Sequence, residues 1–596
     1  MQRARTLFFL LFSKRHFYAA FSWRYGLVLV LLLGWLPARI VRAQPAAPAW
    51  QAALAIDQTA SADYVVMDVA TDVAGDVYIA GGFTGMLTIG STVLTGNSRR
   101  TLFVAKWSPS DNRFVWAQKA TAGNNMTFPF TLAVSGTSVY VAGDFEGIVS
   151  FGATTLTGTA NSRGVFVAKL DAASGAFVWA QRAGSTESGG RGLAVSGANV
   201  YVAGDFKGTA DFGSITLTSF GQSMGRGDGF VAKLVDAGST ASFEWAQQFG
   251  SDTSYPTVRA LAAEGTSVYV GGTIIDAGAR FGPFTFNSMG GGPDGRDGFV
   301  AKLTDAGTTS SFTWVQQVGG SGGEDIRALA VNGPNVYVGG EAVLNSVVSF
   351  GSLAVPSNGG VNGFVAKLTD AGSTSSFNWA QAAAGSSVND LAVRGTSVYV
   401  GGNFNTRVGG TVTFGATTLT GAGGEDLFVA KLTDAGASSS FAWAQGAGGL
   451  RGEDASSLAV SGENVYVVGD FFSNSVQFGA FALAHPNPST RANYLASLRD
   501  APQVLSATPR LTLAGVSLYP NPARGQAVVQ IPGGSGAAQA TVTLINALGQ
   551  LLHTHTLTLP ANGATTAVPL AGLAAGLYVM RVQAGDRQTA HQLIVE

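Results

Sequence analysis

Four short runs decide the fold, and residues 132–181 contain all of them: LAV (132–134), VYVAGDF (139–145), FVAKL (166–170) and FVWAQ (177–181). The runs are rich in β-branched and aromatic residues, which favour strands. In the last run Phe177, Trp179 and Gln181 alternate with other residues, so their side chains share one face of a strand. Glycine-rich turns separate the runs. We therefore predict a unit of four consecutive strands.

The same unit recurs seven times. A tryptophan marks each copy at intervals of about 65 residues. Three further markers accompany it: the Leu-Ala-Val run, the tyrosine of the Val-Tyr run and the Phe-Val-Ala-Lys run. The tryptophans are Trp50, Trp116, Trp179, Trp245, Trp314, Trp379 and Trp443. The tyrosines of the Val-Tyr run are Tyr78, Tyr140, Tyr201, Tyr269, Tyr337, Tyr399 and Tyr466. The Phe-Val-Ala-Lys run begins at Phe103, Phe166, Phe230, Phe299, Phe364 and Phe428, with Tyr494 in the last copy.

Strands that are apolar on both faces must be buried between neighbouring units, and radial packing of such units gives a β-propeller. With Leu-Ala-Val innermost and the tryptophan run outermost, the seventh unit lacks its outer strand. The only unassigned tryptophan run lies at Trp50–Leu54. We predict an all-β protein whose residues 44–500 form a seven-bladed propeller closed by this N-terminal strand. A recurring Phe-Gly-x-x-x-Leu segment predicts a hairpin insertion in each blade.

Residues 1–43 are typical of a secretory signal peptide. They hold seven basic residues and no acidic ones, and an apolar run from Tyr25 to Leu36 precedes Pro37 and Val41-Arg42-Ala43. A retained signal anchor is the alternative. Cleavage after Ala43 leaves 28 basic and 36 acidic residues, a net charge of −8. This charge argues against a nucleic-acid partner, and we expect no membrane span after cleavage.

The C-terminal part follows a different pattern. Residues 501–512 form a predicted linker, and short alternating runs separated by turns then extend over residues 513–596. About eighty residues of this kind predict a small β-sandwich.

Two resemblances accompany these patterns. The four-run repeat, over residues 50–500, resembles the bacterial SBBP-type β-propeller repeat, which implies a fold and says little about function. Residues 513–596 resemble the type A C-terminal sorting domain of the type IX secretion system of Bacteroidetes-like bacteria. The matching motifs are Tyr519-Pro520-Asn521-Pro522, the run 546–550, the run 573–578 and Leu593-Ile594-Val595. This resemblance implies that the secretion machinery recognises residues 513–596, and that the protein is secreted or attached to the outer cell surface.

Residues for catalysis are scarce. The chain has no cysteine, and none of its five histidines lies between residues 44 and 480. A serine nucleophile on the propeller would therefore lack a base unless His485 serves. Three Glu-Asp pairs, at 324–325, 425–426 and 453–454, have the chemistry for glycan cleavage, but their glycine-rich surroundings favour solvated turns. We predict no catalytic residue, no metal site and no cofactor.

One position suggests ligand binding. Arg191, Arg259 and Arg327 stand two residues before Leu-Ala-Val in blades 3 to 5, at the predicted end of the loop that feeds the innermost strand. Three arginines at the rim of the channel suit carboxylate, sulfate or phosphate groups. The alternative is pairing with nearby acids such as Asp325. The tryptophans recur in every unit, which favours packing between blades over ligand binding.

The sequence thus favours a non-catalytic binding or adhesion module with a glycan or protein ligand. A secreted polysaccharide hydrolase or lyase at the channel mouth is one alternative, and a structural surface-layer component is another.

Overall fold

The computed structural model describes residues 47–57, 63–158, 162–185, 187–221, 227–275, 278–289, 295–343, 347–356, 361–405, 408–485, 490–501, 511–534, 536–546 and 551–596. The predicted signal peptide and most of the predicted linker lie outside these ranges. The described residues form strands and turns and contain no helix. The chain divides into two compact units, Met1–Arg499 and Asp500–Glu596.

In its described part, the first unit contains seven antiparallel sheets with four blade strands each, one for each sequence repeat; two of these sheets hold two further hairpin strands. We call them blades 1 to 7 and give their strands from the innermost outward. Blades 1 to 3 are β2 (Tyr64–Thr71), β3 (Val77–Phe83), β6 (Thr101–Ser108) and β7 (Arg113–Lys119); β8 (Thr127–Ser135), β9 (Ser138–Phe145), β12 (Gly164–Asp171) and β13 (Phe177–Gly184); and β14 (Ser188–Ser196), β15 (Asn199–Phe206), β18 (Asp228–Asp236) and β19 (Ala241–Phe249). Blades 4 and 5 are β20 (Tyr255–Glu264), β21 (Ser267–Ile275), β24 (Arg296–Asp305) and β25 (Ser310–Gly319); and β26 (Gly323–Asn332), β27 (Asn335–Val343), β30 (Val361–Asp370) and β31 (Ser375–Ala384). Blades 6 and 7 are β32 (Ser386–Arg394), β33 (Ser397–Asn405), β36 (Glu425–Asp434) and β37 (Ser439–Ala447); and β38 (Ser457–Ser461), β39 (Asn464–Phe471), β42 (Ala492–Arg499) and β1 (Trp50–Ala55).

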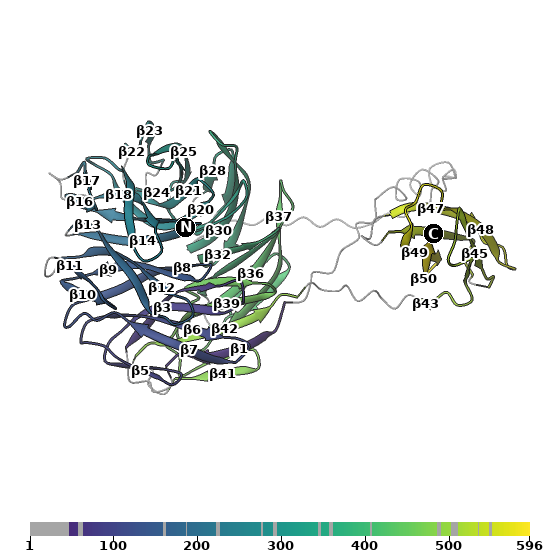
Figure 1. The fold of residues 1–596 in the computed structure, drawn as a ribbon, viewed down its shortest axis with the longest axis horizontal. Coiled ribbons are helices and arrows are strands. Elements are labelled where there is room, and N and C mark those ends of the chain that lie inside the picture. Colours follow the sequence, from purple (N-terminus) through teal and green to yellow (C-terminus); the bar gives the residue numbers. More distant parts are fainter. Residues whose placement is uncertain are drawn as a thin grey trace, which may run out of the picture. The chain divides into compact units, whose positions relative to one another are not determined.

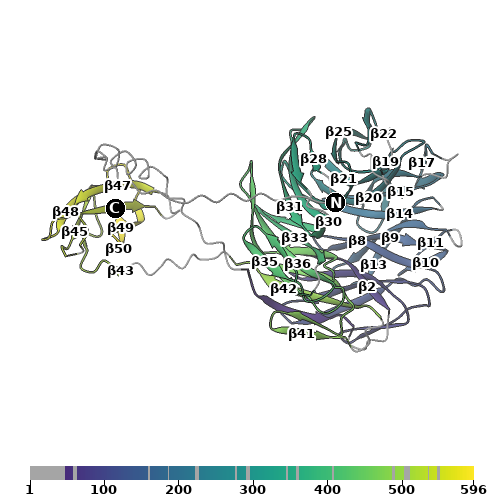
Figure 2. The same cartoon turned by 180° about the vertical axis from the view of Figure 1, so that it is seen from behind.

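The blades close into a ring. Each innermost strand contacts the innermost strand of the next blade, and β38 of blade 7 contacts β2 of blade 1. In Figure 1 the strands follow one another in sequence colours, and purple β1 lies beside green β42. Figure 2 shows from behind that β2 and β42 also come together at this closure. The predicted β-propeller and its closure by the N-terminal strand are therefore confirmed, because β1 pairs antiparallel with β42 as the outer strand of blade 7.

The predicted register of the closing strand is wrong by two residues. In blade 2, Trp179 pairs with Lys169 and Phe177 pairs with Leu170, across a bulge. In blade 7, Trp50 pairs with Leu498, which occupies the place of Leu170. Trp50 therefore takes the place of the repeat phenylalanine, and its ring meets Phe478 edge-on at 5.0 Å, as Phe177 meets Phe151 at 5.4 Å.

Ala52 consequently stands where the other blades have tryptophan. It pairs with Ser497, as each repeat tryptophan pairs with the lysine of Phe-Val-Ala-Lys. Leu54 in turn stands where they have glutamine. The run at residues 50–54 looks like the other tryptophan runs in the sequence, but its pairing with β42 sets a register two residues away from theirs.

Each blade also carries the predicted hairpin, between its second and third strands. The hairpins are β4 (Met86–Ile89) with β5 (Thr92–Thr95), β10 (Ile148–Phe151) with β11 (Thr154–Thr157), β16 (Thr209–Phe212) with β17 (Ile215–Thr218), β22 (Ala279–Phe281) with β23 (Phe284–Phe286), β28 (Val347–Phe350) with β29 (Leu353–Pro356), β34 (Thr411–Phe414) with β35 (Thr417–Thr420), and β40 (Ser475–Phe478) with β41 (Phe481–Ala484). Two of them extend the outer strand of the preceding blade, since β16 pairs with β13 and β28 pairs with β25. Pairing of this kind covers sheet edges that would otherwise stay open.

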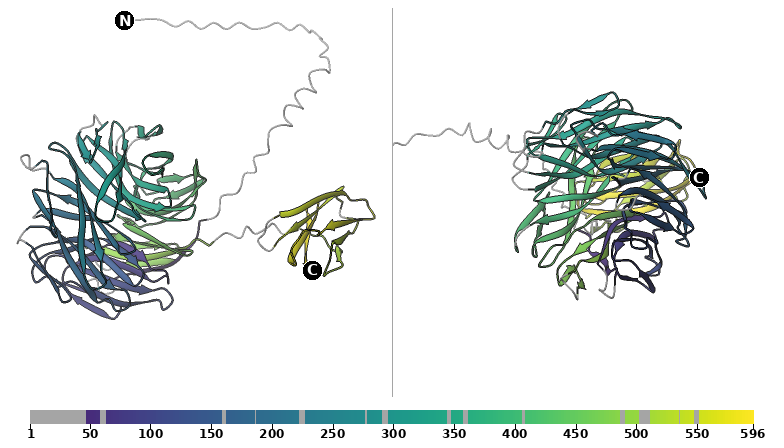
Figure 3. Two further views of the ribbon diagram at one scale, coloured as in Figure 1. Left: turned by 45° about the horizontal axis from the view of Figure 1, so that its top comes forward. Right: turned by 90° about the vertical axis from the view of Figure 1, so that its left-hand side faces the viewer.

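The hydrophobic core lies between blades. One buried cluster joins Val69 and Ile79 of blade 1 to Tyr466, Val468 and Leu495 of blade 7. The strand faces are therefore buried against neighbours, which is why the runs are apolar on both faces. Figure 3 shows the purple and green strands of these two blades side by side in its left view.

The second unit is a β-sandwich, as predicted. Its five-stranded sheet contains β43 (Leu511–Thr512), β50 (Arg587–Val595), β49 (Gly576–Ala584), β46 (Gln539–Ile545) and β47 (Leu551–Thr558). Its three-stranded sheet contains β44 (Ser517–Tyr519), β45 (Gln526–Ile531) and β48 (Ala564–Pro569). Both sheets contribute to one buried cluster, for example through Val529 and Met580.

Candidate functional site: the channel mouth

β-Bulges in the innermost strands line the central channel. In β20 the pairing with β21 skips Arg259, between Val258 and Ala260. A bulge leaves its extra residue unpaired and redirects the side chain. The bulged residues of blades 1 to 6 are Met67, Phe130, Arg191, Arg259, Arg327 and Asn389. Together with Ser456 of blade 7 they line one cavity of about 230 Å³.

The three predicted arginines therefore lie together in the channel, but their local setting differs from the prediction. They lie within the innermost strands, at the bulges, and not at the end of the preceding loop. The bulges were not predictable, because pairing with the neighbouring strand decides where a strand bulges.

The three arginines differ in how free their side chains are. The Arg191 guanidinium lies over the Phe130 ring, 3.8 Å from its centroid. Arg327 contacts Glu341 and donates to Asn389 Oδ1 at 2.8 Å. Arg259 is 49% exposed, and its Nε is 3.7 Å from Asp325 Oδ2. Arg259 is therefore the most available of the three to a ligand.

The alternative prediction, that the arginines pair with nearby acids, also holds for Arg259 and Arg327. The Nε of Arg327 is 3.6 Å from Asp325, so this one carboxylate lies between the arginines of blades 4 and 5. Asp325 also accepts a hydrogen bond from Thr273.

A larger cavity, of about 790 Å³, opens at the end of the channel where the innermost strands begin. Blades 5 to 7 supply most of its wall. Its charged lining residues are Arg259, Arg327, Arg491, Glu341, Glu425, Glu453, Asp454 and Asp470. We call this cavity the channel mouth. It holds cationic and acidic groups side by side, and the exposed ring of Phe472 adds an apolar surface.

Burial raises the pKa of three of these acids, Glu453, Asp454 and Asp470. Desolvation raises the pKa of Asp454 to about 7, and nearby Asp470 adds to the increase while Arg327 opposes it. Desolvation also raises the pKa of Asp470, although Arg491 lies 3.1 Å away and opposes the shift. Near neutral pH, Asp454 is therefore present in both protonation states, so that it can donate as well as accept a hydrogen bond.

The prediction that the Glu-Asp pairs are solvated turns is wrong. Glu324, Asp426 and Glu453 are almost completely buried, and only Glu425 among the six residues is exposed. The glycines before each pair predicted a turn, but Glu324 and Asp325 lie in β26, Glu425 and Asp426 lie in β36, and Glu453 forms a β-bridge with Phe471.

Two buried aspartates share a serine in the channel wall. Ser457 Oγ lies 2.7 Å from Asp68 Oδ1 and 2.8 Å from Asp390 Oδ2. A hydroxyl has one hydrogen and cannot donate to both carboxylates, so one carboxyl must itself be protonated for both bonds to form. Desolvation raises the pKa of Asp68 to about 7 and that of Asp390 to about 6, in keeping with a retained proton.

The repeated tryptophans lie between blades, where they form a polar cluster that we call the blade lock. In the lock, a tyrosine, a lysine and a tryptophan of one blade all bind an aspartate in the hairpin turn of the next. Between blades 2 and 3, Asp236 accepts from Tyr140 at 2.7 Å, Lys169 at 2.6 Å and Trp179 at 3.0 Å. Asp305, Asp370 and Asp434 repeat the arrangement at the next three junctions.

At these four junctions the glutamine two residues after the tryptophan also reaches the next blade, as Gln181 Nε2 does in donating to Ala241 O at 2.6 Å. The sequence predicted a packing role for the tryptophans, but the part played by the lysine and the aspartate was not predicted. The recurrence of Asp-Ala-Gly opposite Phe-Val-Ala-Lys was the available signal.

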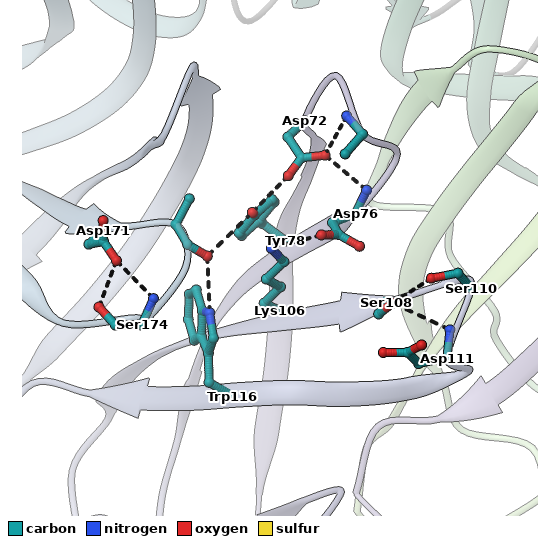
Figure 4. Close-up of polar contacts among 12 residues, drawn as sticks. Asp72, Asp76, Tyr78, Lys106, Ser108, Ser110, Asp111, Trp116, Asp171 and Ser174 are labelled. Carbon is teal, nitrogen blue, oxygen red and sulfur yellow. Dashed lines mark hydrogen bonds and ion pairs between the residues drawn. The ribbon is translucent and has the colours of Figure 1, made fainter.

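The lock between blades 1 and 2 is altered, as Figure 4 shows. Trp116 Nε1 donates to Ala172 O at 3.2 Å, and Tyr78 donates to Asp72 at 2.9 Å. Lys106 pairs with Asp76 at 2.7 Å. Asp171 instead accepts from Ser174 within its own turn.

No histidine of the described residues lines either channel cavity. His485 is buried against Phe471, with ring centroids 5.5 Å apart, and desolvation lowers its pKa. His555 of β47 contacts Thr566 at 3.0 Å. Within the described ranges, no three His, Asp or Glu side chains are placed to hold a metal ion. No helix there has both the length and the apolar character needed to cross a bilayer.

In the second unit, the Tyr-Pro-Asn-Pro motif ties the chain to its last strand. Asn521 donates to Gln592 O at 2.7 Å and accepts from Ile594 N at 2.9 Å. Farther along, Tyr578 donates to Ala574 O at 2.8 Å. Of the predicted motif 546–550, all but Asn546 lies outside the described residues.

Comparisons with known proteins bear on the second unit above all. Residues 517–596 match the family described as the secretion system C-terminal sorting domain. This domain indicates export by the type IX system, so the protein is secreted or attached to the outer cell surface. The domain also implies interaction with the type IX machinery. No curated protein matches the chain.

Solved structures with similar folds are distant. A protein of unknown function from Dyadobacter fermentans has 10% identity and a TM-score of 0.34, covering 76% of this chain and 99% of its own. The sialidase of Trypanosoma rangeli has 11% identity and a TM-score of 0.31, covering 82% and 86%. A 6-phosphogluconolactonase assigned in Bacteroides uniformis has 10% identity and a TM-score of 0.32, covering 64% and 88%. Similarities of this size carry no inference about activity.

Proposed function

We propose that this protein is a non-catalytic recognition module, built on an SBBP-type repeat, that binds its ligand at the channel mouth. The type A route of the type IX system delivers it through residues 513–596, after a signal peptide at residues 1–43 is removed. Recognition then takes place outside the cell.

One observation carries this proposal: the ring is nearly regular, but its channel mouth is not. The blade lock repeats at four successive junctions, whereas the seven equivalent positions at the channel hold five different residue types. Residues that serve packing recur in every blade, and residues that serve a ligand differ between blades. Arg259 adds a half-exposed guanidinium to this irregular surface.

Of the two expected ligand classes, the chemistry of the mouth favours a glycan that carries carboxylate or sulfate groups. A guanidinium binds such groups with paired hydrogen bonds. Asn403 and Asp454 offer donors and acceptors for hydroxyl groups, and Phe472 offers a face for a sugar ring. A cavity of about 790 Å³ has room for one or two sugar units.

The test is a binding measurement on acidic and neutral oligosaccharides with Arg259→Ala. Loss of a charged hydrogen bond costs about 1.5–3 kcal/mol, which lowers affinity for an acidic glycan by roughly tenfold to a hundredfold. Arg113→Ala is the matched control, since Arg113 is exposed on β7 away from the channel. The triple replacement of Arg191, Arg259 and Arg327 by alanine is expected to abolish binding. Unchanged affinity in both arginine variants would refute the proposal.

A hydrolase or lyase is the second candidate, and Asp454 is the observation that favours it. A buried carboxyl with a pKa of about 7 beside a second carboxyl, Asp470, resembles the acid of a glycan-cleaving pair. New reducing ends in the same incubations, lost in Asp454→Asn, would replace the non-catalytic proposal with this one. Self-association without any ligand would favour the structural alternative.

A further inference from the structure

The junction between blades 7 and 1, where the ring closes, lacks the blade lock. Ala52 stands in the tryptophan position and Ser497 in the lysine position. In blade 1, Trp107 pairs with Phe114 as Leu234 pairs with Phe243, which places Pro109 where Asp236 stands in blade 3. Of the lock residues only the tyrosine, Tyr466, remains. We call this junction the seam.

The seam contains a cavity of about 480 Å³, and the substituted residues line it. Tyr466 and Trp107 form an aromatic wall, with ring centroids 6.2 Å apart. Ala52, Ser497 and Pro109 supply the small side chains that leave the space open. The cavity is distinct from the channel mouth, because Asn464 begins β39 and Pro109 lies in the β6–β7 turn, at the opposite end of the blades.

The other six junctions show what fits this space. In each of them an indole ring packs on the tyrosine, with ring centroids 5.9–6.3 Å apart. At four of these junctions the indole NH donates to an aspartate of the next blade at 3.0 Å. At the seam Pro109 replaces that aspartate. Ser497 and Asn112 in the cavity wall carry side-chain oxygens that can accept a hydrogen bond from an indole NH.

The volume allows such an occupant. Apolar cavities of roughly 150 Å³ already bind benzene, and ligand cavities commonly measure about 300–1,000 Å³. The cavity also reaches the surface, because Gln51 and Asn112 in its wall are exposed. A side chain projecting from another protein can therefore enter it.

We propose that the seam cavity is a binding site for a tryptophan side chain presented by a partner protein. The bound indole packs on Tyr466 in the position that a repeat tryptophan holds at the other junctions. A buried aromatic side chain is the usual anchor of a protein interface. This site is independent of the proposed glycan site at the channel mouth.

The test uses the mature full chain with N-acetyl-tryptophanamide as the probe, observed by saturation-transfer NMR. N-acetyl-leucinamide serves as the comparison without a ring, and N-acetylglucosamine tests the alternative of a sugar occupant. We expect saturable binding of the tryptophan probe alone. Ala52→Trp fills the cavity with the repeat residue and is expected to weaken this binding at least tenfold.

Two further variants complete the design. Val178→Trp adds a tryptophan at an exposed position of β13 and is expected to leave binding unchanged. The double variant Ser497→Lys with Pro109→Asp restores the lysine and the aspartate that accompany the indole at four other junctions. It is expected to bind the tryptophan probe more tightly than the wild type, and it serves if Ala52→Trp fails to fold. Absence of binding, equal binding by Ala52→Trp and the wild type, weaker binding by the double variant, or preference for the sugar would overturn the proposal.

Discussion

Replacing Asp305 with asparagine tests whether the blade locks hold the ring together. Asp305 and Lys233 are 2% and 5% exposed and lie 2.8 Å apart. The carboxylate accepts four hydrogen bonds, from Lys233, Tyr201, Trp245 and the backbone of Gly307. Each oxygen faces two donors. An amide has one accepting oxygen, so its NH₂ group must face two of the donors in either orientation.

The expected cost follows from this geometry. Removing one partner of a buried ion pair leaves an uncompensated charge and costs about 3–5 kcal/mol. We therefore expect Asp305→Asn to lower the free energy of unfolding of the propeller by about that amount. Asp111→Asn is the matched control. Asp111 is half-exposed with Arg113 3.5 Å away, and a change within about 0.5 kcal/mol is expected for such a position.

Urea unfolding followed by tryptophan fluorescence suits the measurement, because all ten tryptophans precede residue 500 and the signal excludes the sorting domain. Combining Asp305→Asn with Lys233→Met should cost less than the sum of the single changes, since the stranded charge is then removed. A loss below about 1 kcal/mol for Asp305→Asn, or one equal to that of Asp111→Asn, would refute the role of the lock.

The pH dependence provides a second check on the same residue. Burial raises the pKa of Asp305, but hydrogen bonds from Lys233, Tyr201 and Trp245 outweigh it and lower the pKa below the usual carboxyl value. A lowered pKa stabilises the fold above the pKa of the unfolded carboxyl, about 3.9. That contribution is lost as the pH falls through the folded pKa. The gap between wild type and Asp305→Asn should therefore narrow below about pH 4.

Three further predictions concern other parts of the molecule. Deleting residues 44–56 removes β1, so the melting temperature of the whole propeller should fall, and an unchanged value would contradict closure by this strand. Burial raises the pKa of Asp68 to about 7, so its protonated form is the one that stabilises the fold. The contribution of this proton to stability is complete below about pH 4 and declines as the pH rises towards 7. Asp68→Asn should flatten the slope of stability between pH 5 and 8, and an unaltered slope would exclude the shared proton. Removing residues 513–596 should stop delivery to the cell surface while the tryptophan fluorescence of the propeller stays that of the folded ring, and surface delivery of the shortened chain would show a second sorting signal.

The architecture was predictable because packing imposes the same demand on every blade. A side chain that contacts the next blade must recur at each junction, so the tyrosine and tryptophan markers identified the repeat. The incomplete seventh repeat identified the closing strand. Strand closure requires one N-terminal run, and residues 50–54 were the only candidate.

The register of that strand and the shape of the channel were not predictable. Trp50 carries the same letter as Trp179 but pairs as Phe177 does, and only the partner strand reveals this. The arginine positions were found, but the bulges that turn them into the channel depend on pairing between strands. Burial of Glu324 and Glu453 depends on strand pairing at the ends of the blades, which a glycine-rich sequence leaves undetermined.

The blade lock bears on how the number of blades can change. Blades 3 to 5 each contribute the tyrosine, lysine and tryptophan of one blade lock and the aspartate of the lock before it. A tandem copy of such a repeat therefore carries the lock residues for both of its junctions. The ring can gain or lose a blade by duplication or deletion of about 65 codons. The seam differs, because it joins the first and the last blade through residues that are not part of the repeated lock. Its lining is consequently the part of the ring most free to diverge between related proteins without loss of the fold.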